Sequence, residues 1–327
     1  MKAILVSKPG GPEQLSIGEF PAPVPREDEL LIRVQAAGVN RADILQRQGK
    51  YPPPPGVSPL LGLEIAGVVS MVAKTPGWKP GDRVMALLPG GGYAQLATVN
   101  YQMALPIPDN LSFEQAAGIP EAFLTAFQAL FRVAALKAGE SVLIHAGASG
   151  VGSAAIQLAK AFGIRAIATA GSDKKVQFCR SLGAELAVNY RKESFADAVL
   201  DFTAGKGVDA VIDFVGAPYW ESNLKTLALD GRMVLLGLLG GYRAEALNLL
   251  PILRKRLAIT GSTLRSRALN YKIRLCKEFK SKILPLFAEG TIKPIIDRVF
   301  HWQDVREAHR YMEANKNSGK LILKISD

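Results

Sequence analysis

The stretch that decides the fold runs from Ser141 to Ser172 and reads SVLIHAGASGVGSAAIQLAKAFGIRAIATAGS. It opens with the apolar run Val142 to Ile144, which is typical of a buried parallel strand, and a glycine cluster follows. Apolar residues then recur at helical spacing up to Gly163, and a second apolar run follows from Ala166 to Ala170. Strand, glycine turn, helix and strand form one βαβ unit, whose backbone N–H groups and helix N-terminus can bind a pyrophosphate.

The turn between this strand and this helix is the expected phosphate-binding segment. A glycine pattern alone is weak evidence, but one placed between a strand and a helix is much more specific. Ser149 stands where the full glycine pattern has its middle glycine, and we expect its side chain to move the pyrophosphate slightly outward or to donate its hydroxyl to it. The turn residues expected to contact a cofactor are Gly147, Ala148, Ser149, Gly150, Val151 and Gly152.

The composition is that of a globular protein with room for two domains. The chain has 327 residues, of which 48% are hydrophobic and 21% charged, and no repeat or low-complexity segment is evident. The apolar run near Met1 is too short for a signal peptide, and no apolar stretch approaches roughly 18 residues, so we expect neither secretion nor a membrane span. Only Cys179 and Cys276 are present, which favours a reducing, cytoplasmic environment over a disulfide framework.

The net charge of +11 is compatible with nucleic acid, a membrane surface or an anionic small molecule as partner. Most lysines and arginines are scattered singly, and we interpret the run from Lys272 to Lys282 as a solvated helix face. Lys174 and Lys175 differ, because they follow the second strand of the βαβ unit directly.

The order of the elements predicts an interrupted β-rich domain. Residues 1 to about 120 are mainly short strands separated by Pro and Gly clusters. Six strands with helical crossovers follow and predict a doubly wound parallel sheet. After helices around 268–289 and 303–314 comes a final strand, Lys320 to Ile325, which we expect to return to the N-terminal sheet. The expected domains are 1–121 with 262–327, and 122–261 for the nucleotide.

Seven stretches carry a resemblance to a known family: GVNRADILQRQGKYPPPP, LGLEIAGVV, PGDRVMALLPGGGYAQ, AAGIPEAFLTAFQAL, HAGASGVGSAAIQLAK, VDAVIDFVG and YMEANKNSGKLIL. Through them the chain resembles the medium-chain dehydrogenase/reductase superfamily over its whole length. Within it, the stretches are similar to the zinc-free quinone oxidoreductases related to zeta-crystallin, particularly the subgroup induced in animals by a tumour-suppressor transcription factor. The resemblance implies an α/β fold in which a Rossmann domain is inserted in a GroES-like catalytic domain, with NADPH as cofactor.

The sequence predicts no metal site. Zinc-dependent members of the superfamily carry a Cys in the first stretch and a His beside the glutamate of the second, where this chain resembles them only in Glu64 and has Asn40 and Leu63 instead. Zinc commonly takes four Cys or His ligands, and the three histidines form no ligand-spaced cluster. We interpret His145, at a strand end, as a hydrogen-bonded structural residue. Reduction of an electrophilic acceptor therefore fits better than alcohol oxidation, which a Lewis acid usually supports.

The residues after the second strand favour NADPH over NADH. An NAD site usually has Asp or Glu roughly 20 residues after the glycine turn, where this chain has Gly171 and Ser172. A carboxylate would repel a 2′-phosphate, whereas Lys174 and Lys175 would attract it, although Asp173 directly before them acts in the opposite direction. The alternative is that both lysines belong to a solvated helix start, but cations at that end oppose the helix dipole.

The resemblance also assigns individual cofactor contacts. It implies that Lys175 binds the 2′-phosphate, that Gly171 and Ser172 line the ribose, and that Tyr190 packs nearby. The positions that contact the ribose or the nicotinamide in relatives correspond here to Gly216, Gly237, Leu238 and Asn317.

For the acceptor pocket the expected residues are Asn40 and Tyr51, lined by Leu63 and Leu238. The amide of Asn40 can hydrogen-bond an acceptor oxygen or the nicotinamide carboxamide. Tyr51 precedes four prolines on a stiff loop and could cover a flat ring, or could be an exposed loop aromatic. No acid–base pair is evident, and hydride transfer mainly requires an aligned, dry pocket.

Three activities remain open at this stage. The favoured one is NADPH-dependent quinone reduction, by a homodimer that pairs through the last Rossmann strand, Leu257 to Thr260, as relatives do. The second is NADPH-dependent reduction of enones or alkenals. The third is RNA binding, as in some crystallin-like relatives, although the positive clusters lack interleaved aromatic residues that stack on bases.

Overall fold

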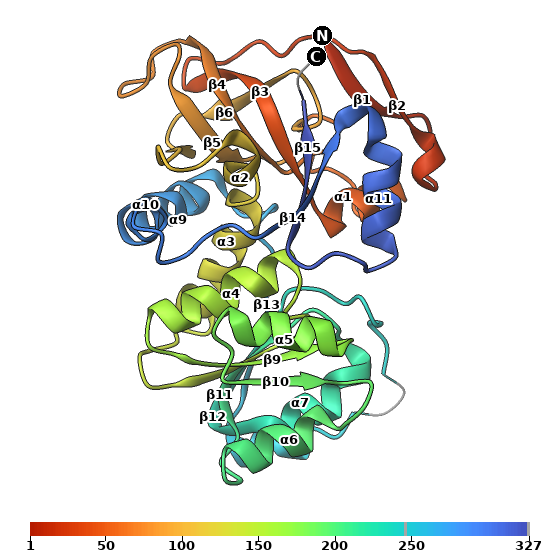
Figure 1. The fold of residues 1–327 in the computed structure, drawn as a ribbon, viewed down its shortest axis with the longest axis vertical. Coiled ribbons are helices and arrows are strands. Elements are labelled where there is room, and N and C mark those ends of the chain that lie inside the picture. The colour runs from red at the N-terminus through yellow and green to blue at the C-terminus, as the bar shows by residue number, and fades with distance from the viewer. Residues whose placement is uncertain (245–246, 326–327) are drawn as a thin grey trace. The chain divides into compact units, whose positions relative to one another are not determined.

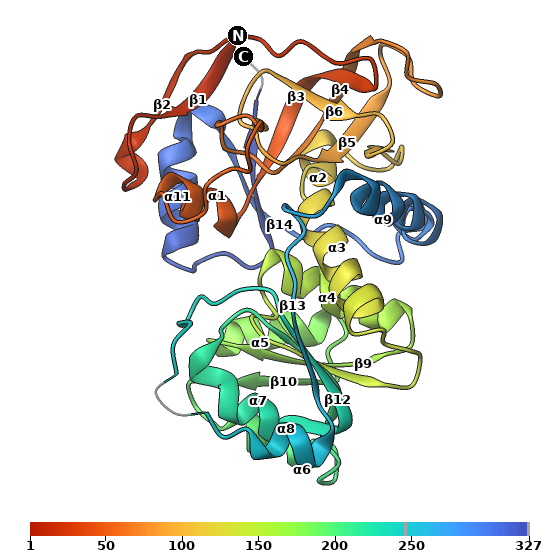
Figure 2. The ribbon, with the colours of Figure 1, turned by 180° about the vertical axis from the view of Figure 1, so that it is seen from behind.

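The computed structural model describes residues 1–244 and 247–325. Residues 326 and 327, the end of the predicted return segment, lie outside the described residues. The chain divides into two compact units, Met1–Leu124 with Leu264–Asp327 and Thr125–Thr263, which are called the β-rich unit and the nucleotide unit below. Each unit is traced in Figures 1 and 2.

The nucleotide unit is built on a six-stranded parallel sheet with the strand order β10-β9-β8-β11-β12-β13. This order, with the first strand of the unit in the middle, is that of the doubly wound nucleotide-binding fold, so the predicted fold class is confirmed. The strands are β8 (Ser141–Ile144), β9 (Arg165–Ala170), β10 (Leu186–Asn189), β11 (Val208–Asp213), β12 (Leu227–Leu235) and β13 (Ala258–Gly261).

Helices cover both faces of this sheet. Helices α4 (Gly150–Ala161) and α5 (Asp173–Ser181) lie on one face, and α6 (Phe195–Phe202), α7 (Trp220–Thr226) and α8 (Leu250–Lys255) on the other (Figures 1 and 2). The α4 sequence is almost all small or apolar and is buried from Gly152 to Ala159. The face covered by α6 and α7 buries a cluster that includes Leu143, Val211 and Met233. Each such side chain contributes about 1.5–3 kcal/mol by leaving water.

The β-rich unit contains a seven-stranded sheet with the order β14-β15-β3-β4-β5-β7, and β6 also pairs with β3. A separate hairpin of β1 (Lys2–Val6) and β2 (Leu15–Glu19) lies beside it. The sheet strands are β3 (Glu29–Val39), β4 (Glu64–Val72), β5 (Arg83–Leu87), β6 (Leu96–Asn100), β7 (Ala104–Pro106), β14 (Ile296–His301) and β15 (Lys320–Lys324).

The final strand joins the N-terminal sheet, as predicted. Strand β15 pairs antiparallel with β3, with Leu321 opposite Val39 and Ile322 opposite Gly38, and parallel with β14. Segments nearly 300 residues apart therefore form the centre of one sheet. The helices of this unit are α1 (Arg41–Arg47), α2 (Phe113–Ala116), α9 (Leu269–Lys282), α10 (Leu284–Ala288) and α11 (Val305–Glu313), while α3 (Pro120–Phe127) and a π-helical turn, η2 (Gln128–Val133), lead into the nucleotide unit.

One predicted helix is wrong in extent. The amphipathic pattern over 268–289 predicts a single helix, but the structure ends α9 at Lys282 and starts α10 at Leu284. Pro285 explains the break, because it lacks an N–H and its ring would clash with the carbonyl of Ser281. Ser112 caps α2, since its hydroxyl accepts from Gln115 N at 3.2 Å and Gln115 Oε1 accepts from Ser112 N at 2.9 Å.

Within the described residues, no helix combines the length and the apolar character that crossing a membrane would require. The short 3-10 turns are η1 (Pro12–Gln14), η3 (Ala217–Tyr219) and η4 (Trp302–Asp304).

Candidate functional site

Two glycines of the turn in the nucleotide unit, Gly147 and Gly152, are packed too closely to carry a side chain. A Cβ on Gly152 would lie 2.3 Å from the carbonyl oxygen of Ala146, and one on Gly147 would lie 2.8 Å from Ala168 Cβ and 2.9 Å from Cys179 Sγ. Ala146 itself has a positive φ of 48°. The two glycines therefore let the N-terminus of α4 lie close to strands β8 and β9.

Ser149 is the N-cap of α4. Its hydroxyl oxygen accepts a hydrogen bond from Gly152 N at 3.0 Å, so one N–H of the helix start is already bonded. The hydroxyl proton remains available to a phosphate oxygen, because a hydroxyl both donates and accepts. The serine thus occupies the N–H of Gly152 and offers its own hydroxyl hydrogen as a donor in its place.

The predicted ribose and 2′-phosphate residues gather at the end of β9. A Cβ on Gly171 would lie 2.7 Å from the hydroxyl of Tyr190, so only glycine admits this tyrosine. Ser172 caps α5 by accepting from Lys175 N at 3.3 Å, which places Lys175 in the first turn of α5. The structure therefore brings Gly171, Ser172, Lys175 and Tyr190 together.

Asp173, which the sequence marks as unfavourable for a 2′-phosphate, is bonded on both carboxylate oxygens. Asn189 Nδ2 donates to Oδ1 at 2.8 Å and Lys192 Nζ donates to Oδ2 at 2.6 Å. These bonds to Lys192 and Asn189 lower the pKa of Asp173. The negative charge of Asp173 is thus balanced by Lys192, a residue that the sequence interpretation missed.

Gly216 and Gly237 follow strands β11 and β12. Gly216 has a φ of 88°, and a Cβ there would lie 2.5 Å from Gly241 O and 2.7 Å from Leu238 Cδ2. Asp213 holds this turn by accepting from the N–H groups of Val215 at 2.7 Å and Gly216 at 3.2 Å. Leu238, which is half exposed, lies against Gly216, so three of the predicted contacts occupy one end of the sheet.

His145 is buried beneath the Asp213 turn at this end of the sheet, in agreement with its interpretation as a structural residue. The ring is fully buried, with Nδ1 2.9 Å from Thr169 Oγ1 and Nε2 2.7 Å from Asn223 Oδ1. Asn223 Nδ2 donates in turn to Asp213 Oδ2 at 3.2 Å. Burial lowers the pKa of His145 to about 4, so the ring is neutral at physiological pH and fixes the Asp213 turn.

In the β-rich unit, Asn40 begins α1 and is held by an ion pair. Glu64 Oε1 lies 2.5 Å from Lys320 Nζ, and both side chains are buried, with 0% and 5% of their surface exposed. Asn40 Nδ2 donates to Glu64 Oε1 at 2.9 Å, and Lys320 Nζ donates to Asn40 Oδ1 at 2.7 Å. We call Asn40, Glu64 and Lys320 the amide triad.

A chain of buried polar side chains continues behind Asn40. Asp43 Oδ2 accepts from Asn40 N at 2.8 Å and from the Tyr93 hydroxyl at 3.3 Å. The Tyr93 hydroxyl is 3.4 Å from His309 Nε2, and His309 Nδ1 is 3.1 Å from Arg47 Nη1. Burial raises the pKa of Asp43 to about 6, and burial together with the Arg47 charge lowers the pKa of His309 to about 3.

Tyr51 is half-buried and is packed against Arg265. The guanidinium carbon lies 5.1 Å from the ring centroid, and Nη1 donates to Tyr51 O at 3.5 Å. Arg265 Nε donates to Pro89 O and Nη2 to Gln46 Oε1, both at 2.7 Å. Burial raises the pKa of the Tyr51 phenol, so it is neutral and can donate a hydrogen bond. The Tyr51 loop is therefore fixed by a cation.

The remaining predicted residues are placed as follows. Leu63 is buried next to Glu64, and its carbonyl accepts from Leu88 N at 2.7 Å. Glu121 N donates to Glu64 Oε2 at 2.8 Å, and the Glu121 charge contributes to the raised pKa of the Tyr51 phenol, after burial. Asn317 precedes β15, and its Nδ2 donates to Gly319 O at 2.9 Å.

The sequence interpretation missed the roles of Lys320 and Arg265. In the sequence, Lys320 is only the lysine of SGKLIL, and Arg265 is only one of two nearby arginines, Arg265 and Arg267. Neither position has a local pattern that predicts burial. Their partners Pro89 and Asn40 lie more than 170 residues away along the chain, so only the folded structure reveals these contacts.

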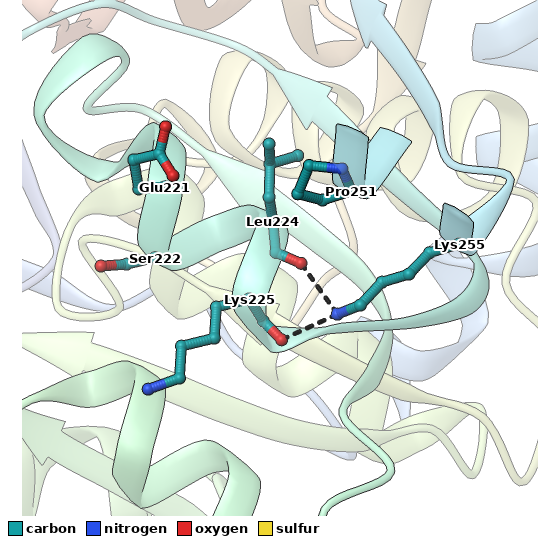
Figure 3. Close-up of a pocket in the computed structure, with 6 residues that line it drawn as sticks. All are labelled: Glu221, Ser222, Leu224, Lys225, Pro251 and Lys255. Atoms are coloured by element: carbon teal, nitrogen blue, oxygen red, sulfur yellow. Dashed lines mark hydrogen bonds between the residues drawn. The ribbon is translucent and has the colours of Figure 1, made fainter. Parts of the chain in front are cut away.

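Across residues 1–244 and 247–325, no group of three or more His, Cys, Asp or Glu side chains could hold a metal ion. Figure 3 shows a surface hollow between α7 and α8. The ammonium of Lys255 at its edge donates to the carbonyls of Leu224 and Lys225, both at 3.0 Å, and so caps the end of α7. The hollow is lined by Glu221, Ser222, Leu224, Lys225, Pro251 and Lys255.

Two family descriptions match the chain. Residues 26–109 match the alcohol dehydrogenase GroES-like domain, and residues 150–278 match the zinc-binding dehydrogenase family. The quinone oxidoreductase of Salmonella typhimurium is 36% identical, covering 97% of both chains, and the human quinone oxidoreductase is 32% identical, covering 99% of this chain and 97% of that protein. A polyketide synthase subunit of Mycobacterium tuberculosis is 33% identical over 98% of this chain, which spans only 14% of its length.

Solved structures agree with these relatives. The Escherichia coli quinone oxidoreductase complexed with NADPH has a TM-score of 0.88 and 33% identity, and covers 99% of this chain and 100% of its own. A structure titled NAD-dependent alcohol dehydrogenase has a TM-score of 0.89 at 34% identity over 100% of both chains, and the CurK enoyl reductase has 0.87 at 30%, over 99% and 98%. This chain belongs to the quinone oxidoreductase family of the medium-chain dehydrogenase/reductase superfamily.

Proposed function

We propose that this protein is an NADPH-dependent oxidoreductase that reduces quinones by hydride transfer without zinc. The observation that carries the proposal is the site at the end of β9, where glycine replaces the usual carboxylate, Lys175 follows, and Asp173 is paired with Lys192. In this proposal residues 122–261 form the cofactor domain, and residues 1–121 with 262–327 form the catalytic domain. The quinone oxidoreductase relatives, one of them complexed with NADPH, support it.

The residues of the glycine turn fit a dinucleotide. Gly152 lets the first turn of α4 approach Ala146 O, and Gly171 lets the Tyr190 hydroxyl approach the end of β9, since a Cβ at either position would collide with these groups. Ser149 and the first N–H groups of α4 would hold the pyrophosphate, and Lys175 would neutralise the 2′-phosphate. Gly216, Gly237, Leu238 and Asn317 are proposed to contact the ribose and the nicotinamide.

When bound, NADPH supplies a hydride from C4 of its nicotinamide ring, which together with one proton converts a quinone to a hydroquinone. In the proposed pocket Asn40 offers an amide hydrogen to the acceptor oxygen, and Tyr51 covers the flat ring. Leu63 and Leu238 are proposed as apolar lining that excludes water. Solvent water can deliver the proton, because hydride transfer leaves a hydroquinone anion whose phenolate oxygen is basic enough to take it.

The second candidate is reduction of enones or alkenals with NADPH. The enoyl reductase among the similar structures and the polyketide synthase relatives favour it. The acceptor would again need a hydrogen bond to its carbonyl oxygen from Asn40 or Tyr51. The two activities therefore differ in pocket shape and acceptor reactivity rather than in cofactor chemistry.

We also propose a cytoplasmic homodimer. Strand β13 has β12 as its neighbour in the sheet, and a second copy could pair with its open edge. Both cysteines, Cys179 and Cys276, are buried free thiols, which supports a reducing compartment. Light scattering coupled to size exclusion should give twice the 35.1 kDa chain mass, and a single chain mass would refute the dimer.

Steady-state assays test the main proposal. We expect turnover of 1,4-benzoquinone and 9,10-phenanthrenequinone with NADPH, and slower turnover with NADH. A short alkenal should be a poor acceptor under the same conditions. Activity on the alkenal with none on either quinone would establish the second candidate instead. Quenching of cofactor fluorescence on binding gives an independent measure of NADPH affinity.

A further inference from the structure

Asn40 is held from both ends of its amide by charged groups. Glu64 accepts from Nδ2, and Lys320 donates to Oδ1. The second Nδ2 hydrogen has a weaker partner, Gly38 O at 3.4 Å. This hydrogen is therefore the one that Asn40 can give to another acceptor without breaking a strong bond.

Lys320 and Glu64 are built into the centre of the sheet. Besides Asn40 and Glu64, the ammonium donates to Val39 O at 3.2 Å, so its three hydrogens have three oxygen partners. Gly38 makes room for the carboxylate, since a Cβ there would lie 2.1 Å from Glu64 Oε1. The other carboxylate oxygen accepts from Glu121 N at 2.8 Å. Both charged side chains thus contact the same neutral group, the amide of Asn40.

The electrostatic effect on that amide is directional. A cation at the amide oxygen draws electron density from nitrogen to oxygen and makes the N–H hydrogens stronger donors. The carboxylate at the other hydrogen fixes which way the amide faces. A buried ion pair costs desolvation energy and often stabilises a fold no more than apolar residues of similar size. Stability alone thus gives little reason for this pair.

We propose that Lys320 is a positioning residue for catalysis, acting through Asn40. Paired with Glu64, it orients and polarises the Asn40 amide so that the second Nδ2 hydrogen stabilises the negative charge that develops on the acceptor oxygen during hydride transfer. The inference rests on the proposed function and extends it by a residue that contacts neither acceptor nor cofactor.

The experiment compares variants that separate charge from folding. Lys320→Met leaves Glu64 as an unpaired buried carboxylate and can unfold the chain, so the double variant Lys320→Met/Glu64→Gln removes both charges at nearly constant size. We expect the double variant to fold, to bind NADPH with unchanged affinity, and to lose about 10- to 100-fold in kcat with quinone. Lys324→Met, the same change at an exposed position of β15, should leave kcat unchanged.

A double-mutant cycle shows whether Lys320 acts through Asn40. In an Asn40→Ala background, removing the Lys320–Glu64 charges should change kcat less than twofold, because the polarised group is gone. Full kcat in the charge-free double variant, or the same loss with and without Asn40, would overturn the proposal.

A second readout does not depend on turnover. The side-chain NH₂ protons of Asn40, observed by NMR after selective ¹⁵N-asparagine labelling, should move upfield in Lys320→Met/Glu64→Gln, and Lys324→Met should leave them in place. Unchanged signals would contradict polarisation. If the wild type reduces no quinone or alkenal, the proposed function fails while these signals still decide what Lys320 does to Asn40.

Discussion

The guanidinium of Arg265 stacks on the ring of Tyr51 at 5.1 Å and also donates to the carbonyl of Pro89 at 2.7 Å. A loop rich in proline is thereby tied to the segment just after residue 263, where the chain re-enters the β-rich unit. The contact sets the position of the aromatic ring that we propose to cover the acceptor.

Arg265→Met should therefore weaken acceptor binding. We expect the KM for quinone to rise about three- to tenfold, equivalent to about 1 kcal/mol of lost stacking and ordering, with kcat changed less than twofold. Steady-state kinetics at saturating NADPH measure this. Arg267→Met is the matched control, because Arg267 stacks on Tyr271 at 4.8 Å on an exposed part of the same segment. Equal effects of both variants would remove Tyr51 positioning as the explanation.

The charge of Lys175 should determine the preference for NADPH. Lys175→Ala should weaken NADPH binding more than NADH binding, by roughly 1.5 to 3 kcal/mol for one charge-assisted contact. Fluorescence titrations with both cofactors give the two dissociation constants. Lys174→Ala, one residue earlier and exposed, serves as the control. Equal losses of NADPH and NADH affinity in Lys175→Ala would show that Lys175 does not read the 2′-phosphate.

The exposed ion pair of Asp173 and Lys192 should also affect the preference for NADPH over NADH. Lys192→Ala leaves the Asp173 charge unbalanced near the proposed 2′-phosphate, so the ratio of NADPH to NADH affinity should fall about two- to fivefold, as for an exposed ion pair. Adding Asp173→Asn to Lys192→Ala should restore the ratio. A ratio that stays low in the double variant would mean that Lys192 contacts the phosphate itself. The effect should shrink at high salt.

The nucleotide unit was predictable because its signals are local. The strand, the glycine turn and the helix from Ser141 to Ala161 lie next to one another in the sequence, and Gly152 can be recognised from spacing alone. The end of α9 could not be predicted from the apolar pattern, because that pattern continues through Ile283. Pro285, which breaks the helix, lies three residues after the last residue of α9. Strand β14 was missed because only Phe300 of its residues is buried, so its sequence has no regular apolar alternation, and the strand is defined by its pairing with β15.

The amide triad shows the limit of the sequence at the candidate site. Asn40 was predicted from its place in a motif, and its type suggested hydrogen bonding. The ion pair that holds it consists of Glu64 and Lys320, which lie 24 and 280 positions from Asn40 in the sequence. These residues meet only because their strands lie in one sheet of the folded protein. A lysine in a strand is usually exposed, and nothing adjacent to Lys320 indicates that its partner is a carboxylate.

Acid sensitivity should come partly from His309. The pKa of this ring in the folded protein, about 3, lies below its ordinary value of 6.5, because burial and the nearby Arg47 disfavour its cation. The unfolded chain therefore binds a proton that the folded chain does not, and the free energy of unfolding falls as the pH drops below about 6.5. His145, with a pKa of about 4, acts in the same direction. Asp43 acts in the opposite direction between its ordinary pKa of 3.8 and about 6, since its folded form holds the extra proton.

His309→Gln isolates one of these contributions. Gln Oε1 can still accept from Arg47, so folding should survive, and Asp43 and His145 are present in both proteins. Between pH 7 and pH 5 the wild type should lose about 2 kcal/mol more unfolding free energy than the variant, because one proton is linked over about 1.5 pH units. Urea unfolding at the two pH values measures the difference. A matching pH dependence in both proteins would mean that His309 is protonated in the fold, which is incompatible with its bond to the Arg47 guanidinium through Nδ1.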